Sequence, residues 1–218
     1  MKALLIKDFR LLKNQRVFFA TFGVFGILFL LVLDDPMFSI WYMTIALSSF
    51  VMSTISYDSY NGGEAYLFSL PISRKEYVRE KYVYNFIMTG IAVVFTGSVS
   101  FIVLQIRHRD WPFGYILTSV LSAFVASNIV NSLNIPLDLK FRSDKTRVVF
   151  MVIWGTVIAV GVLVTFVCGK IGINVNDVLE KLFTIYRVEM LVAVVVLMAL
   201  FLTVSYLCSV RIMEKKEF

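Results

Sequence analysis

The sequence predicts an all-α, polytopic membrane protein with six transmembrane helices. Of its 218 residues, 59% are hydrophobic and only 17% are charged, whereas a soluble domain has about 45–50% apolar and about 25% charged residues. The apolar residues also gather in stretches free of Asp, Glu, Lys, Arg and His, each at least as long as the roughly 17 residues that a spanning helix needs. We therefore expect a single transmembrane domain over residues 1–218, with spans at 17–33, 37–57, 82–106, 113–133, 148–168 and 190–210.

The positive charges predict how these spans are oriented. When the connecting segments are assigned alternately to the two sides, 16 of the 21 Lys and Arg residues fall on one side and five on the other. Lys and Arg collect on the cytoplasmic side of a membrane protein. Both termini are therefore expected in the cytoplasm, and the net charge of +6 gives no reason to expect nucleic acid as a partner.

Residues 1–16 are predicted to form an amphipathic helix on the membrane surface. Leu5, Phe9 and Leu12 fall on one face of such a helix, and most of the basic residues fall elsewhere. A helix of this kind lies in the interface, with its basic face toward anionic lipid headgroups. An ordinary positively charged flank of the first span is the alternative.

The cytoplasmic segment 58–81 is predicted to hold a short helix set crosswise between the second and third spans. Gly62-Gly63 interrupts the helix of the second span, and Glu64–Ser69 can then form one or two turns. Ser73 and Glu76 form an S-x-x-E capping box, which starts the helix that continues into the third span.

This crosswise helix carries four large apolar residues, Tyr66, Leu67, Phe68 and Leu70. Apolar side chains exposed in a cytoplasmic segment need a partner or a membrane to cover them. We expect them to dock on a partner, with burial in the membrane interface as the alternative.

The outer loop 169–189 is predicted to hold a second amphipathic helix. Residues Val175–Tyr186 place apolar side chains at i, i+3, i+4, i+7, i+8 and i+11, which is the pattern of a helix with one apolar face. At about 12 residues this helix is too short to cross the bilayer, so we expect it to lie on or dip into the outer leaflet. A loop helix packed on the spans of the same chain is the alternative.

No residue is predicted to catalyse a reaction or to bind a metal or a cofactor. The sequence has no G-x-x-x-x-G-K-[ST] motif, no C-x-x-C pair and a single histidine, His108. The serines within the spans have no histidine or carboxylate near them in the spans to activate them. The chain is therefore not expected to be an enzyme by itself.

Small and polar residues recur every four positions on the predicted fourth span. Such stripes allow helix backbones to approach closely, and packing within the chain is the simplest interpretation. A dimer seam or a wall of the substrate pathway is the alternative for these residues, Ser119, Ala123, Ser127 and Asn131.

Taken together, these features resemble the membrane subunits, or permeases, of type 2 ABC exporters over essentially the whole chain. The most specific likeness is to the stretch between the second and third spans of compact bacterial permeases that export peptides or confer bacteriocin resistance. Exporters of phenol-soluble modulins belong to this size class. The residues that carry the likeness are the run Leu70-Pro71-Ile72-Ser73-Arg74, with Tyr77 and Lys81-Tyr82 after it and Asp58 and Gly63 before it.

The resemblance implies a function for segment 58–81. In the family this region contains a coupling helix that docks in a groove of a separate ATPase subunit. ATP and magnesium would bind to that ATPase subunit and not to this chain. It also implies a second permease copy or homologue, a hydrophobic or amphipathic cargo such as a peptide, and a place in the bacterial cytoplasmic membrane. Carried over by position, the ATPase-docking residues are Glu64, Tyr66, Leu67, Phe68, Leu70 and Arg74.

Two other functions fit the same topology. One is a membrane subunit that senses peptides or gives immunity to them without transport. The other is an ATP-independent secondary transporter, although the spans lack the charged residues that usually mark such a site.

Overall fold

The computed structural model describes residues 1–33, 35–107, 111–141, 143–170 and 187–216. Every regular element in these ranges is a helix, so the predicted all-α class is confirmed. The elements are α1 (Lys2–Asn14), α2 (Arg16–Val32), α3 (Pro36–Ser48), α4 (Phe50–Ser59), the 3₁₀ turn η1 (Tyr60–Gly62), α5 (Gly63–Ser69), α6 (Arg74–Ile106), α7 (Phe113–Lys140), α8 (Ser143–Lys170) and α10 (Arg187–Lys215).

Four helical segments in the described ranges are long and apolar enough to cross a membrane: Pro36–Ser59, Arg74–Ile106, Phe113–Lys140 and Val192–Lys215. Helices α1 and α2 are bent by 66° to each other and make a fifth candidate if they are taken as one span. Helix α8 covers the predicted fifth span and contains a shorter apolar helix, Trp154–Lys170. The count of six spans therefore stays a prediction. The predicted outer helix at 175–186 lies outside the described residues.

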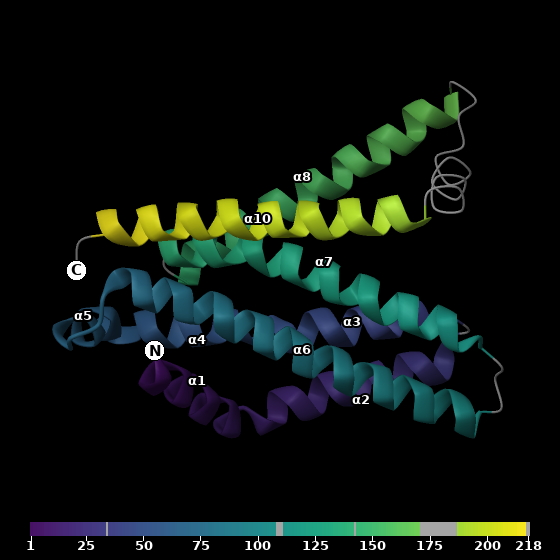
Figure 1. Cartoon of the computed structure of the whole chain (residues 1–218), viewed down its shortest axis with the longest axis horizontal. Coiled ribbons are helices and arrows are strands. Elements are labelled where there is room, and N and C mark those ends of the chain that lie inside the picture. The colour runs from purple at the N-terminus through teal and green to yellow at the C-terminus, as the bar shows by residue number, and fades with distance from the viewer. Residues whose placement is uncertain (34, 108–110, 142, 171–186, 217–218) are drawn as a thin grey trace.

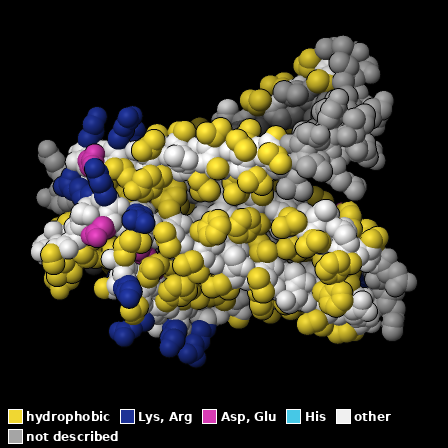
Figure 2. Space-filling model, in the orientation of Figure 1, with side chains coloured by type: hydrophobic (Ala, Val, Ile, Leu, Met, Phe, Trp, Pro, Cys, Tyr) yellow, Lys and Arg dark blue, Asp and Glu magenta, His cyan; other side chains and the backbone are white. Residues whose placement is uncertain are grey.

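Both termini lie at the same end of the bundle, together with α5 (Figure 1). On the face shown in Figure 2, Lys and Arg side chains gather at this end, whereas hydrophobic side chains cover the middle of the bundle. We call it the basic end; it consists of α1, α5, the first turns of α6 and the last turn of α10. The common location of the two termini agrees with the predicted alternation of the connecting segments.

Helix α7 is the centre of the bundle, since it packs against α10, α3 and α6, while α8 leans on α7 and diverges from the rest (Figure 1). A large cluster of buried apolar side chains lies toward the basic end and includes Phe50, Tyr77 and Leu139. A smaller one around Ile40 and Ala123 lies farther along the bundle. The basic end is thus the more heavily packed part.

Helices α2 and α3 form the tight hairpin that the short connection 33–35 requires. The Asp35 side chain caps α3 by accepting a 2.8 Å hydrogen bond from the backbone N–H of Met37. At Gly26 the two helices come so close that a Cβ atom would lie 2.1 Å from Cγ of Met43. A larger residue at position 26 would therefore require the Met43 side chain of α3 to move.

The predicted second span is divided into α3 and α4 at Ser49, a break that the apolar pattern does not predict. The hydroxyl groups of Ser48 and Ser49 both donate to the backbone carbonyl of Ile45, at 3.1 and 2.7 Å. Serine hydroxyls that bond to the preceding turn bend helices, which accounts for the interruption.

Candidate functional site

Helix α5 is set between α4 and α6 by the signals that predicted it. Gly62 has a φ of 76°, a left-handed conformation that ends the 3₁₀ turn and that glycine adopts without a steric cost. At the other side, the N–H of Glu76 donates to Oγ of Ser73 at 3.2 Å, and the Ser73 N–H donates to the Glu76 carboxylate at 3.4 Å. The structure thus has a short helix, Gly63–Ser69, in this segment, and the Ser73–Glu76 capping box is present.

The apolar residues of α5 do not all point outward, which corrects that part of the prediction. Tyr66 and Leu70 are 73% and 43% exposed, but Leu67 is buried in the apolar cluster of the basic end. The ring of Phe68 packs edge-on against Tyr77, with 5.5 Å between centroids. A partner of α5 would therefore contact Tyr66 and Leu70 first.

The end of α10 holds α5 and the start of α6. Nζ of Lys216 lies 2.8 Å from the carboxylate of Glu64, which is itself 7% exposed. The Arg74 guanidinium donates to the carbonyl groups of Met213 at 3.0 Å and of Glu214 at 2.6 Å. We call these contacts the C-terminal clasp. Two predicted docking residues, Glu64 and Arg74, are thus engaged within the chain.

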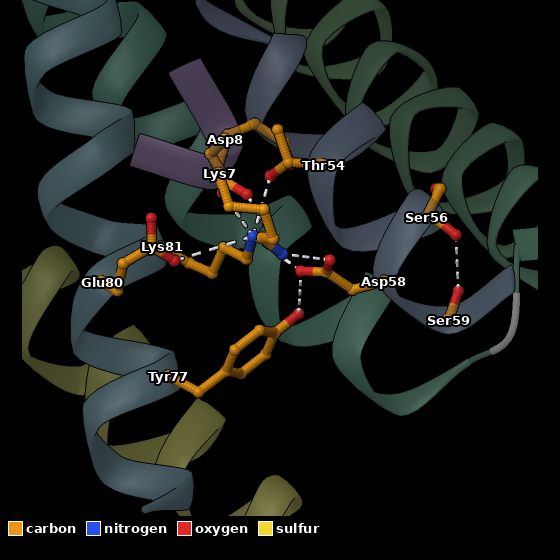
Figure 3. A network of polar contacts seen from close by, with 10 residues as sticks. Lys7, Asp8, Thr54, Ser56, Asp58, Ser59, Tyr77, Glu80 and Lys81 are labelled. Atoms are coloured by element: carbon orange, nitrogen blue, oxygen red, sulfur yellow. Dashed lines mark hydrogen bonds and ion pairs between the residues drawn. The ribbon is translucent and has the colours of Figure 1, made fainter. Parts of the chain in front are cut away.

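A second group of charges lies behind α5, where α1, α4 and α6 meet (Figure 3). Nζ of Lys81 lies 2.5 Å from Asp8 and 2.9 Å from Asp58, and it donates to the Thr54 hydroxyl at 3.1 Å. Nζ of Lys7 also pairs with Asp58, and it lies 3.2 Å from Asp8. We call Lys7, Asp8, Asp58, Glu80 and Lys81 the buried charge cluster.

The charges of this cluster do not balance, since three carboxylates face two ammonium groups. The side chains of Asp8, Glu80 and Lys81 are fully buried. Neither oxygen of Glu80 has a hydrogen-bond partner, and the nearest ammonium group, that of Lys81, is 3.6 Å away. Within the described ranges, no group of three or more His, Cys, Asp or Glu side chains is placed to hold a metal ion. The two lysines are therefore the only cations seen to compensate these carboxylates in the part of the chain that the structure describes.

The cluster joins the two ends of segment 58–81. Asp58 belongs to the last turn of α4, just before the segment turns away, and Lys81 lies on α6, just after it returns. The Tyr77 hydroxyl forms a second contact between α6 and α4 by donating a 3.1 Å hydrogen bond to Asp58. Asp8 joins α1 to Lys81 of α6 and Lys7 joins α1 to Asp58 of α4, so α1 is fixed to the same point.

The model of the family described as ABC-2 family transporter protein matches residues 3–214, nearly the whole chain. The chain belongs to this family. The ABC-2 protein is accordingly the permease subunit of a type 2 ABC transporter, a multi-pass membrane component. Members of this family are the transport component and are not themselves catalytic, which implies partnering with an ABC ATPase. No curated protein and no solved structure matches it.

Sequence reasoning missed the buried charge cluster of this ABC-2 protein. One signal was present: Asp8 falls between Leu5 and Leu12 on the apolar face of the predicted helix 1–16, where a carboxylate is out of place. In the structure that face packs against the protein itself, since Leu4 and Asp8 are buried and the Phe9 ring lies 5.2 Å from that of Tyr84. Helix α1 thus forms where predicted, and its inner face contacts α6.

The small-residue stripe of the ABC-2 protein lies in the interior of a single chain. Its four members are at most 3% exposed. The side-chain amide of Asn131 donates to the Ser48 hydroxyl at 3.1 Å and to the amide oxygen of Asn85 at 2.7 Å, which joins α7 to α3 and α6. This burial fits packing within the chain, and a dimer seam at Ser119, Ala123, Ser127 and Asn131 would require these helices to separate.

Proposed function

We propose that this permease belongs to an ATP-driven exporter and that α5 is its coupling helix, which docks the ATPase. The observation that carries the proposal is the arrangement of α5 itself. It presents Tyr66 to the outside, with Leu70 exposed directly after its last residue, while Glu64 and Leu67 hold it to the bundle. An exposed aromatic residue on an otherwise fixed helix is the kind of anchor that dominates protein–protein contacts.

Two sets of contacts connect α5 to the helices of the membrane domain, so a displacement of α5 would be transmitted through both. The Glu64–Lys216 pair connects it to the end of α10, and the Arg74 bonds connect the start of α6 to the same end. The buried charge cluster connects both ends of segment 58–81 to α1, α4 and α6. When the ATPase binds and hydrolyses ATP with magnesium, movement of α5 would therefore shift several helices together.

The composition of the spans supports a hydrophobic or amphipathic cargo. A hydrated ion would find few charged groups in the predicted spans to replace its water, and burying an uncompensated charge is costly. We propose amphipathic peptides, including those of the phenol-soluble modulin type, as the cargo. They would leave across the bacterial cytoplasmic membrane through a pathway completed by a second copy or a homologue, with the basic end in the cytoplasm.

The docking role can be tested with Tyr66, which is a better probe than Phe68 because Phe68 also packs within the chain. We expect Tyr66→Asp to weaken binding of the purified permease to its ATPase by about 30-fold, equivalent to a hot-spot loss of about 2 kcal/mol. Peptide-stimulated ATP turnover in proteoliposomes should fall with it. Tyr66→Phe keeps the ring and should bind nearly as the wild type does.

Two outcomes would contradict the proposal in different ways. Unchanged affinity and turnover in Tyr66→Asp would remove α5 as the docking element. Peptide transport by proteoliposomes that contain the permease without any ATPase would instead remove the ATP-driven mechanism and favour a secondary transporter. Binding of peptide without transport under either condition would favour the sensing or immunity function.

A further inference from the structure

A groove of about 400 Å³ lies between α6 and α10 on the outer surface of the bundle, with Asn128 of α7 at its floor. Its walls include Tyr82 and Phe86 from α6 and Leu202 and Tyr206 from α10. Several of the polar groups there already have partners: the Tyr82 hydroxyl bonds to Ser205 and Ser209 at 2.5 and 2.9 Å, and the Asn128 amide donates to the Phe124 carbonyl at 2.9 Å. The space that remains is apolar.

The volume of the groove limits what it can hold. Ligand sites span roughly 300–1,000 Å³, so this groove falls at the small end of that range. The lining is almost wholly apolar and comes mainly from side chains of two neighbouring helices. The groove therefore suits a flexible apolar chain that follows the surface between α6 and α10.

An exposed cation, Arg79, lies on α6 about one helical turn before the groove begins. Arg79 lies three and seven positions before Tyr82 and Phe86, so the three residues share a face of α6. The Arg79 side chain is exposed and forms no hydrogen bond or ion pair with any residue that the structure describes. An arginine in this position can bind a phosphate with two parallel hydrogen bonds.

We propose that the groove binds one acyl chain of an anionic phospholipid and that Arg79 binds the phosphate of the same molecule. The apolar part of the groove and the cation follow each other along α6 in the order that a lipid needs, with the chain toward the middle of the bundle and the headgroup toward the basic end. The surrounding membrane supplies this ligand. The site does not depend on ATPase docking, because it involves neither α5 nor the exposed Tyr66.

The experiment uses the purified full chain in detergent and measures by native mass spectrometry how much added lipid it retains. The probes are phosphatidylglycerol and phosphatidylcholine with identical acyl chains. The wild type should retain phosphatidylglycerol preferentially. Arg79→Ala should reduce that preference about fivefold, as expected for the loss of one basic contact. Arg10→Ala removes another exposed cation of the basic end, away from the groove, and should leave the preference unchanged.

A second variant tests the apolar part of the site. Thr203 also lines the groove, and Thr203→Phe should fill it and lower the retention of both lipids, whereas the isosteric Thr203→Val should not. Glycerol phosphate without acyl chains should bind at least about tenfold more weakly than phosphatidylglycerol, because it forgoes burial of the acyl chain.

Several results would overturn the proposal. These are equal retention of the two lipids by the wild type, an unchanged preference in Arg79→Ala, or glycerol phosphate binding as well as the lipid. A change of oligomeric state in Thr203→Phe with normal lipid retention would show that a second copy occupies the groove instead.

Discussion

Lys81 and Asp8 form an ion pair of 2.5 Å between two fully buried side chains that are 73 positions apart in the sequence. The same ammonium group reaches Asp58, which stands on the other side of α5 in the sequence. Three helices thus meet at one nitrogen atom. The α5 segment leaves and rejoins the bundle at this point. The ion pairs of Lys81 therefore hold α1, α4 and α6 together where the segment begins and ends.

We expect Lys81→Met to destabilise the protein by about 3–5 kcal/mol, because it leaves the carboxylates of Asp8 and Asp58 buried with less compensation. The matched control is Lys75→Met, since Lys75 pairs with Glu214 at 3.4 Å but its side chain is 69% exposed. Exposed pairs of this kind contribute about 0–1 kcal/mol. Denaturant unfolding in one detergent measures both variants, and similar losses would show that the cluster is not a stabilising centre.

We expect Glu80→Gln to cost much less than Asp58→Asn. Both oxygens of Glu80 lack hydrogen-bond partners, so few interactions offset the cost of burying its charge. Removing that charge leaves two carboxylates facing two lysines. Asp58 accepts from Lys7, Lys81 and Tyr77, and these donors would lose a charged acceptor. The unfolding midpoints of the two variants give the comparison. A larger loss in Glu80→Gln would mean that the Glu80 carboxylate is compensated by a further group.

We expect Gly62→Ala to destabilise the protein by about 1–2 kcal/mol, because a residue with a Cβ is strained at a φ of 76°. Gly90 lies within α6, and a Cβ atom added there would have no other atom within 4 Å. Gly90→Ala should therefore be neutral or stabilise by up to about 1 kcal/mol. Thermal unfolding of both variants checks the sign of each change, and stabilisation by Gly62→Ala would contradict the left-handed turn.

We expect the single variants Glu64→Lys and Lys216→Glu each to lower ATPase stimulation in the complex, because each places like charges together in the C-terminal clasp. The double variant restores opposite charges and should recover part of the activity. Recovery should be incomplete, since Lys216 also donates to the carbonyl of Leu139 at 3.1 Å. A double variant no better than either single one would show that the clasp does not act on α5.

The local elements near the basic end could be predicted because their signals lie within a few residues. Gly62 and the Ser73–Glu76 box determine the start and end of the turns around α5, and they are in place in the structure. The division of the second span at Ser49 was missed, since a serine in an apolar run is compatible with an unbroken helix until its hydroxyl bonds to the preceding turn.

The pairing of charges could not be predicted, since it depends on which helices meet. Nothing local to Asp8 indicates that its partner is Lys81, and nothing local to Glu64 indicates that its partner is Lys216, 152 positions later. The burial of Leu67 is of the same kind. It follows from the packing of α5 on the bundle rather than from the pattern of apolar residues in α5.

The Glu64–Lys216 pair means that α5 reaches its full set of contacts only when α10, which follows it by more than a hundred residues, has joined the bundle. Until α10 has been inserted, Glu64 lacks this ammonium group and the early part of the protein holds α5 with fewer contacts. A nascent or stalled subunit would then offer the ATPase a loosely held helix. Productive docking on α5 would therefore be expected only after α10 has packed against the rest of the bundle.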